Sequence, residues 1–390
     1  MFILNRLFKH WKSENIPLIF LCLVVLGYVM KGPLPKFLDV TLISYIILYC
    51  LAIYKLFFLK QPLSIFKIDS IAYIWAITLL LSIIYSPYTS AAIFKVAKFI
   101  FLGLSLYFFP RFFIKKRTQF LVFFKYLLIL ATFIELIVIV DFIVKGAPLG
   151  RYTAFDTVHP IPLTMVGATT SLTALLLLLY KQVGFYYISL CLVPSLAIII
   201  IGSSKGPLIS FFITLIIFMP ALSKKLKLKH IITILVLIYI TIHFDFLNKN
   251  LDYYIFRFNN LSEDQSSLER IFLYKHALNL FINSPFWGVG VSGISSDYYP
   301  HNIILEILAE NGLILFFLFL LVIIMLIFSY IKFITILRHD CVTAIVLAIL
   351  TISIISLQFS WTYVDHKYLY LGLGLLITNF KLLKDEKIER

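Results

Sequence analysis

Residues 268–317 read LERIFLYKHALNLFINSPFWGVGVSGISSDYYPHNIILEILAENGLILFF, and this stretch decides the fold. It is the one long polar excursion in a chain that is otherwise a series of apolar runs. The whole sequence has 390 residues, of which 61% are hydrophobic and 14% charged, and its mean hydropathy is +0.99. Such a composition cannot cover a water-soluble surface, so the sequence predicts an all-α, polytopic integral membrane protein.

Apolar runs long enough to cross about 30 Å of hydrocarbon recur from end to end, and each must be helical to satisfy its own backbone. About twelve such spans are predicted, and they form a single membrane domain over residues 1–390. The predicted spans are 16–30, 38–59, 68–85, 91–109, 120–144, 160–180, 183–201, 207–222, 231–246, 313–331, 342–361 and 368–380.

The net charge of +15 is explained by the sorting of basic residues between the two sides of the bilayer. With the N-terminus inside, about twice as many basic residues fall on the cytoplasmic side as on the outer side. This asymmetry predicts that both termini are cytoplasmic, and it accounts for the charge without a nucleic-acid partner. The first apolar run lacks an Ala-x-Ala-like cleavage site, so we expect a retained helix. The four cysteines show no CxxC spacing, and no metal site is predicted.

The longest segment outside the predicted spans is 247–312, one large loop before the tenth span, and the topology places it on the outer, periplasmic side. Residues 248–269 are polar and predict a loop, whereas 270–282 predict an amphipathic helix. Gly288, Gly290 and Gly293 allow tight turns after it. A second short helix is expected over 301–310, with Asn302 at its start, and should run through Gly312 into the tenth span.

Several cationic groups are expected beside the membrane on this outer side, with few carboxylates near them: Lys95, Lys98, Arg151, Lys205, Arg270 and His301. Such a set suits a polyanionic headgroup such as a pyrophosphate, because Arg gives bidentate phosphate contacts and Lys a compact charge. The ordinary pKa of His301 suits a group that accepts a proton from an attacking hydroxyl.

Each candidate also has a purely structural interpretation. Arg270 could anchor its helix at the headgroups, and His301 could satisfy backbone groups at a helix start. The four other cations could simply extend to the interface. Glu135 and Asp141, in the fifth predicted span, could pair with a lysine such as Lys98. His159 could be a loop residue or a ligand.

The pattern of Arg270, then Ser284-Pro285-Phe286-Trp287-Gly288, then Pro300-His301-Asn302 and the downstream Glu306, Glu310, Asn311 and Gly312 resembles the signature region of bacterial O-antigen ligases and related O-antigen polymerases. The segment Ser203-Ser204-Lys205-Gly206 resembles that family's Ser-Arg-Gly turn, with Lys where the family usually has Arg.

The resemblance implies a metal-independent, cofactor-free glycosyltransferase of the bacterial inner (cytoplasmic) membrane, surrounded by membrane lipids and with its active site on the periplasmic face. A glycan on undecaprenyl pyrophosphate would move to an acceptor hydroxyl, which for a ligase belongs to lipid A-core. Arg270 and His301 would be catalytic. Lys205, Arg151, Lys95, Lys98 and Asn302 would bind the pyrophosphate or the substrate.

Other functions stay open at the level of sequence. An O-antigen or capsule repeat-unit polymerase of the same family uses the same lipid-linked donor with a glycan acceptor. A twelve-helix transporter or flippase is the alternative from another class, but its long loop usually lies between spans six and seven, where this chain has only Lys181 and Gln182. A scaffold in an envelope assembly leaves the polar loop unexplained.

Overall fold

The computed structural model describes residues 13–35, 38–222, 245–259 and 265–388. These residues form helices joined by loops, with one isolated bridge between Ala154 and Val158, so the all-α prediction is confirmed for them. The helices are η1 (Ser13–Asn15), α2 (Ile16–Met30), α3 (Val40–Ile53), η2 (Tyr54–Phe58), α4 (Asp69–Ser82), α5 (Thr89–Lys98), η3 (Phe99–Leu104), α6 (Ser105–Phe113), α7 (Arg117–Val144), α8 (Pro160–Leu179), α9 (Phe185–Gly202), α10 (Lys205–Leu222), α12 (Asp245–Asn259), α13 (Gln265–Asn283), α14 (Ile303–Lys332), η4 (Phe333–Leu337), α15 (Cys341–Ser356) and α16 (Lys367–Ile388).

Within the part of the chain that the structure describes, six helices are long and apolar enough to cross a membrane, and the chain is a multi-pass membrane protein. They are Val40–Phe58, Thr89–Phe113, Arg117–Val144, Pro160–Leu179, Phe185–Gly202 and Ile303–Ile336, and shorter apolar helices accompany them. Apolar side chains on their outer surfaces are exposed, such as Phe133 and Val140 on α7 and Phe317 on α14, as expected for surfaces that face lipid. The ninth predicted span lies almost wholly outside the described residues, so the count of twelve stays a prediction.

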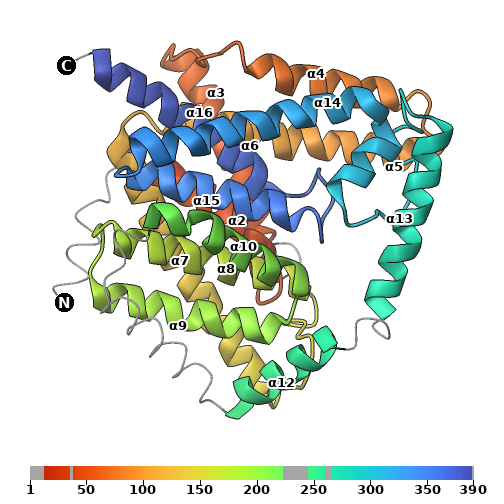
Figure 1. Cartoon of the computed structure of the whole chain (residues 1–390). Coiled ribbons are helices and arrows are strands. Elements are labelled where there is room, and N and C mark those ends of the chain that lie inside the picture. Colours follow the sequence, from red (N-terminus) through yellow and green to blue (C-terminus); the bar gives the residue numbers. More distant parts are fainter. Residues whose placement is uncertain (1–12, 36–37, 223–244, 260–264, 389–390) are drawn as a thin grey trace.

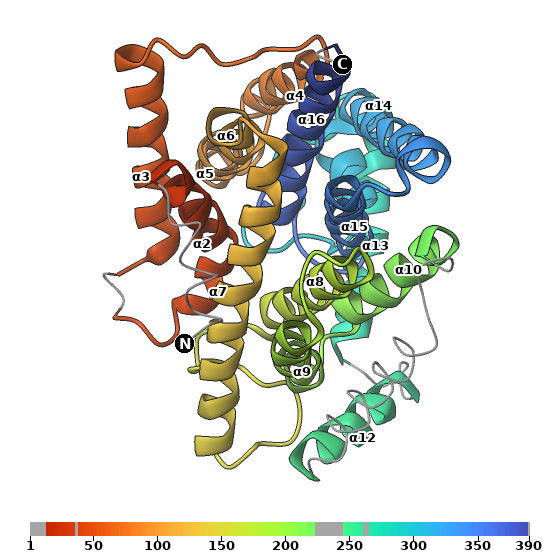
Figure 2. The same cartoon turned by 90° about the vertical axis from the view of Figure 1, so that its left-hand side faces the viewer.

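The most enclosed helix is α8, in which Leu175 is the one residue that is not fully buried. It lies among α7, α9, α10 and α15 (Figure 2). Small residues let its neighbours approach closely. A Cβ added to Gly167 would lie 2.6 Å from the carbonyl oxygen of Ser195 on α9. Close packing of small residues is how helices associate where no hydrophobic effect separates them from lipid.

The loops between helices gather at two ends of the bundle. At one end the loop before α14 contacts the loop after α4 through the hydroxyl of Ser86, which donates to the carbonyl of Val291 at 2.7 Å. At the other end the hydroxyl of Tyr180 donates to the carbonyl of Arg338 at 2.7 Å. Helix α13 lies across the first end, and the C-terminal part of α16 projects at the other (Figure 1). We call the first the α13 end.

The prediction of a loop over 248–269 is wrong for its first part, because α12 spans Asp245–Asn259. Polar residues at 248–250 suggested a loop, but Leu251 and Ile255 lie four positions apart, which is helical spacing. A helix does cover the predicted range 270–282: it is α13, which begins five positions earlier, at Gln265. Its amphipathic character stays a prediction.

The second short helix is also confirmed. Asn302 caps α14, which continues through Gly312 to Lys332 as predicted, although the backbone breaks at Gly312 with φ 63°.

Candidate functional site

A cavity of about 550 Å³ opens at the α13 end, and we call it the α13 cavity. It brings together three of the residues predicted for the site, although they are far apart in sequence: Arg151, Arg270 and His301. The remaining lining residues are His159, Ile161, Glu269, Phe272, Leu273 and Tyr298. Arginine and histidine side chains therefore meet in one polar hollow, beside apolar side chains on the same wall.

Three elements supply these groups. Arg270 projects from the first turns of α13, and Arg151 comes from the loop that precedes α8. His159 forms the N-cap of α8, where its Nδ1 accepts a hydrogen bond from the backbone N–H of Ile161 at 3.3 Å. Pro160 occupies the first helical position, where its missing N–H costs nothing. The position of His159 at the start of α8, just before Pro160, therefore fixes it at the wall of the cavity.

His301 occupies the last loop position before the cap of α14, with a left-handed φ of 55°. Its ring lies against the ring of Tyr299, with the centroids 4.3 Å apart. Burial, followed by the positive charge of Arg270, lowers the pKa of His301 to about 4. The imidazole is therefore neutral at pH 7. Its buried Nδ1 has no hydrogen-bond partner among the residues that the structure describes.

Both the oxygen and the nitrogen of the Asn302 side-chain amide form hydrogen bonds with the protein backbone. Its Oδ1 accepts from the N–H of Leu305 at 3.1 Å, and its Nδ2 donates to the carbonyl of Gln358 at 3.4 Å. These bonds start α14 and fix the direction in which the chain leaves His301. The geometry therefore gives Asn302 a positioning role, and the predicted contact with substrate stays a prediction.

The break in α14 at Gly312 anchors the loop that carries His301. Because the helix is interrupted there, the carbonyls of Ala309 and Glu310 accept from the N–H groups of Val289 and Gly290, at 2.9 and 2.8 Å. Gly288 and Gly290 have positive φ, as their predicted turns require, and Gly293 does not. The glycine-rich loop is thus tied to α14 by its backbone.

Lys95 lies apart from the α13 cavity, and the expectation that it has few carboxylate neighbours is wrong. Its Nζ lies 2.7 Å from a carboxylate oxygen of Glu306 and 2.7 Å from one of Glu310. Tyr363 donates its hydroxyl to Glu310 at 3.0 Å, and Ser292 donates its backbone N–H to the same carboxylate at 3.0 Å. The charge of Lys95 is therefore used within the protein.

Glu306 and Glu310 were not predicted as site residues, although a signal was present. Two glutamates four positions apart in a predicted helix occupy one helix face, and such a pair needs a cation once it is buried. Lys95 is that cation, supplied by α5. This group, with Tyr363, is called the Lys95 cluster.

The other predicted cations lie outside the lining of the α13 cavity. Lys98 pairs with Asp365 at 3.5 Å and lines a different cavity. Lys205 begins α10, next to the left-handed Ser203. The structure brings neither to Arg270, and their predicted contacts with pyrophosphate stay predictions.

Glu135 and Asp141 do not pair with Lys98, as the sequence had allowed. Glu135 accepts a hydrogen bond from the hydroxyl of Ser195 at 2.8 Å, inside the bundle. Asp141 accepts from the backbone N–H of Phe155 at 2.8 Å and lies 3.6 Å from Lys145. Both carboxylates hold helices and loops together.

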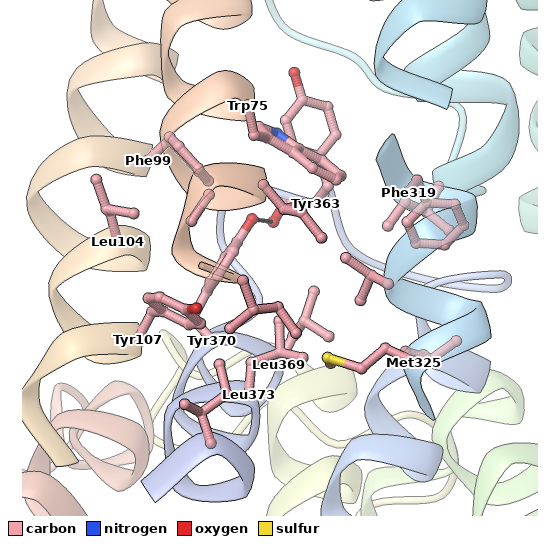
Figure 3. Close-up of a pocket in the computed structure, with 17 residues that line it drawn as sticks. Trp75, Phe99, Leu104, Tyr107, Phe319, Met325, Tyr363, Leu369, Tyr370 and Leu373 are labelled. Carbon is pink, nitrogen blue, oxygen red and sulfur yellow. Dashed lines mark hydrogen bonds between the residues drawn. The ribbon is translucent and has the colours of Figure 1, made fainter. Parts of the chain in front are cut away.

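An apolar cavity of about 70 Å³ lies beside the Lys95 cluster and shares Tyr363 with it. Figure 3 shows Phe319 and Met325 facing it from α14, with Leu104 and Tyr107 on the opposite side and Trp75 of α4 above. The hydroxyl of Tyr370 donates to the carbonyl of Tyr363 at 2.5 Å. Tyr363 therefore connects an ionic cluster to an apolar space within the bundle.

The fold and this site define a multi-pass helical membrane protein with a cationic cavity at one end. Residues 190–320, about a third of the chain, match the family model of the O-antigen ligases, the family that the motifs resemble. The match contains Lys205, Arg270, His301 and both glutamates of the Lys95 cluster. The comparison with curated proteins gave no match. The comparison with solved structures gave none either. The family is one of membrane enzymes of the O-antigen ligase and polymerase type.

Proposed function

We propose that this protein is a membrane glycosyltransferase that moves a glycan from undecaprenyl pyrophosphate to an acceptor hydroxyl in the α13 cavity. The observation that carries the proposal is the meeting of Arg151, Arg270 and the neutral His301 in one cavity of a chain that matches the family model of the O-antigen ligases. The favoured acceptor is lipid A-core, as in a ligase. A repeat-unit polymerase, with a growing glycan as acceptor, is the second candidate.

The two arginines suit the donor. A guanidinium holds a phosphate by two parallel hydrogen bonds and keeps its charge at every physiological pH. Arg270 would hold the pyrophosphate, and Arg151 lies close enough to share the same ligand, since both line one cavity. Positive charge fixed beside the leaving group stabilises the charge that develops on it as the bond breaks.

His301 suits the acceptor. The acceptor oxygen attacks the anomeric carbon, a new glycosidic C–O bond forms, and the C–O bond to pyrophosphate breaks with its electron pair leaving on the phosphate. The acceptor proton passes to the imidazole of His301, which is neutral and able to take it. This step needs no metal ion and no cofactor, because the arginines supply the positive charge.

The proposed orientation places the α13 cavity on the periplasmic face of the inner membrane, with both termini in the cytoplasm. Its support is the charge at the opposite end of the bundle. Lys115, Lys116 and Arg117 lie there, and Arg117 pairs with Asp340 in the loop before α15. Short loops rich in Lys and Arg face the cytoplasm in most bacterial membrane proteins.

The test is complementation of a host strain that lacks this gene. Arg270→Ala and His301→Ala are expected to lower glycan transfer at least about a hundredfold, because each removes a group used in the transition state. Lys275→Ala is the matched control, since Lys275 is an exposed cation of the same helix outside the cavity. Immunoblots of the membrane fraction establish that all variants are present at equal amounts.

Gels of surface glycolipids distinguish the possible outcomes. Loss of the whole ladder with accumulation of undecaprenyl-linked polymer supports a ligase, and a core that carries a single repeat supports a polymerase. Full transfer by both Arg270→Ala and His301→Ala would show that the site is wrong. An unchanged ladder in the gene-deletion strain would argue for another glycan or for the transporter.

A further inference from the structure

A second cavity, of about 410 Å³, lies next to the α13 cavity, and we call it the Trp361 cavity. Residues of α2, α3, α8 and α16 line it, together with the loop before α16. The residues that matter here are Tyr28, Lys98, Tyr299, Trp361, Asp365 and His366. The function proposed above uses none of them.

Two N–H donors in this lining lack an acceptor among the described residues: Nε1 of Trp361 and Nε2 of His366. Nδ1 of His366 accepts from the backbone N–H of Leu369 at 3.3 Å, so a neutral ring carries its hydrogen on Nε2. Burial lowers the pKa of His366 to about 3, which keeps the ring neutral at pH 7. The two rings lie 5.6 Å apart. A ligand that supplies oxygen acceptors to both is what this arrangement lacks.

Three lysines and two aspartates line this cavity, and each lysine is bound to another group of the protein. The Nζ of Lys367 donates to the carbonyl of Val24 at 3.0 Å. Lys31 pairs with Asp39 at 2.6 Å, and Lys98 pairs with Asp365 at 3.5 Å. The three ammonium groups are therefore engaged within the protein. A neutral ligand rich in hydroxyls finds neutral donors in the rings and an acceptor in the partly exposed Asp365, because an ionised carboxylate accepts several hydrogen bonds.

Aromatic rings add a surface for the apolar face of a sugar. Tyr28 meets Trp361 edge to face, with the centroids 6.5 Å apart. Trp361 has a left-handed φ of 75°, an unfavourable conformation for a bulky residue that the surrounding packing maintains. Rings of this kind bury a large area while their polar edge still donates a hydrogen bond.

The two cavities share one wall. Tyr298 lines the α13 cavity and its neighbour Tyr299 lines the Trp361 cavity, while the ring of Tyr299 contacts that of His301. A ligand in the Trp361 cavity is therefore separated from the proposed proton acceptor by a single residue.

We propose that the Trp361 cavity binds the saccharide of the acceptor and directs its hydroxyl toward His301. The inference rests on the proposed function, which supplies the need for an acceptor. The saccharide has two possible sources, the core of a surface glycolipid or the end of a lipid-linked glycan, and both present the same hydroxyl-rich chemistry.

The test measures binding to the purified full-length chain in lipid nanodiscs. The probes are the oligosaccharide released by mild acid from the host's surface glycolipid core, the oligosaccharide released from its undecaprenyl-linked glycan, and undecaprenyl pyrophosphate itself. The variants are Trp361→Phe, which keeps an aromatic ring and removes the N–H, and Asp365→Asn, which changes a partly exposed side chain. Trp287→Phe is the control, because the Trp287 side chain is 63% exposed and lies outside both cavities.

We expect Trp361→Phe and Asp365→Asn each to weaken binding of one oligosaccharide at least about fivefold, with undecaprenyl pyrophosphate and the control unaffected. Binding of the core oligosaccharide identifies the first source, and binding of the glycan oligosaccharide the second. If the unsubstituted protein binds neither, or if both variants bind like the control, the saccharide site is refuted. A separate result, unchanged binding of undecaprenyl pyrophosphate by Arg270→Ala, would refute the proposed function.

Discussion

The ammonium nitrogen of Lys95 lies 2.7 Å from a carboxylate oxygen of Glu310, and their side chains are only 14% and 2% exposed. The pair joins α5 to α14 beneath the loop that carries His301. Ser292 of that loop donates its N–H to the same carboxylate. The carboxylate of Glu310 therefore fixes the position of this loop and also balances the charge of Lys95 inside the bundle.

The first prediction concerns this charge balance. Lys95→Met leaves the carboxylates of Glu306 and Glu310 without a cation, and we expect a loss of about 3–5 kcal/mol in the free energy of unfolding. Lys98→Met is the matched control, because Lys98 is 35% exposed and its pair with Asp365 should contribute about 1 kcal/mol at most. Thermal unfolding of the purified proteins measures both. Equal midpoints for the two variants would contradict a structural role for Lys95.

The Lys95 cluster also shows what the sequence could predict. Hydropathy located most helices within a few residues, because each apolar run satisfies a local requirement of the bilayer: α2 matches its predicted span of 16–30, and α8 begins at Pro160 as predicted. The partner of Lys95 lies more than two hundred positions away. Such pairing depends on which helices pack together, and no local pattern carries that information.

For the candidate site, too, the sequence predicted some features and could not predict others. The motif placed Arg270 and His301 together, and the structure brings them to one cavity with Arg151. It could not show that Lys98 and Lys205 lie outside that cavity, because cations on the same side of a membrane need not converge. The donors of Trp361 and His366 carried no signal in sequence, since their lack of acceptors is a property of packing alone.

The second prediction concerns Gly290, where φ is 89°. A Cβ at this position would lie 2.7 Å from the backbone Cα of Ser86, so Gly290→Ala must strain the loop or move α4. We expect a loss of about 2 kcal/mol or more in stability, together with reduced glycan transfer. Gly184→Ala is the control, because φ there is −74° and nothing lies within 4 Å of the added carbon. If both variants lose activity at the same temperature, the packing around Gly290 does not contribute to stability.

The third prediction concerns pH. The pKa of His301 lies at about 4, below its ordinary value, because of burial and then the charge of Arg270. Protonation is thus disfavoured in the folded protein, and His301 keeps its ability to accept a proton as pH falls from 7 toward 5. We expect transfer to lose activity only as pH falls through about 4. Arg151→Gln removes a nearby positive charge that lowers the pKa of His301, so this variant should lose activity at a higher pH than the unsubstituted protein.

The control for the pH profile is Lys275→Gln. It removes a charge outside the α13 cavity, so the pH at which activity is lost should not change. The same pKa shift affects stability with the same sign. The unfolded chain binds a proton at His301 below about pH 6.5 and the folded chain does not, so stability falls as pH drops from 6.5 toward 4. An activity limb near pH 6.5 in the unsubstituted protein would exclude a buried, neutral His301 as the proton acceptor.

The fourth prediction concerns Lys205, which stands where related sequences are expected to carry Arg. If its contribution is a positive charge at the start of α10, Lys205→Arg should keep glycan transfer within about threefold. Lys205→Ala should lower transfer at least about tenfold. The complementation assay measures both at matched membrane levels. Equal activity of the two variants would show that the charge of Lys205 is not used.

The fifth prediction separates positioning by Asn302 from a contact with substrate. Asn302→Ser keeps a side-chain oxygen that can cap α14, so we expect kcat within about threefold of the unsubstituted protein. Asn302→Ala removes the cap at a cost of about 1 kcal/mol and frees the chain next to His301, so kcat should fall about tenfold with an unchanged KM for the lipid-linked donor. Steady-state kinetics in nanodiscs provides both constants. A rise in KM that is equal for Ser and Ala would instead show that the amide of Asn302 binds the donor, because a serine hydroxyl preserves the cap but cannot reproduce both hydrogen bonds of the amide.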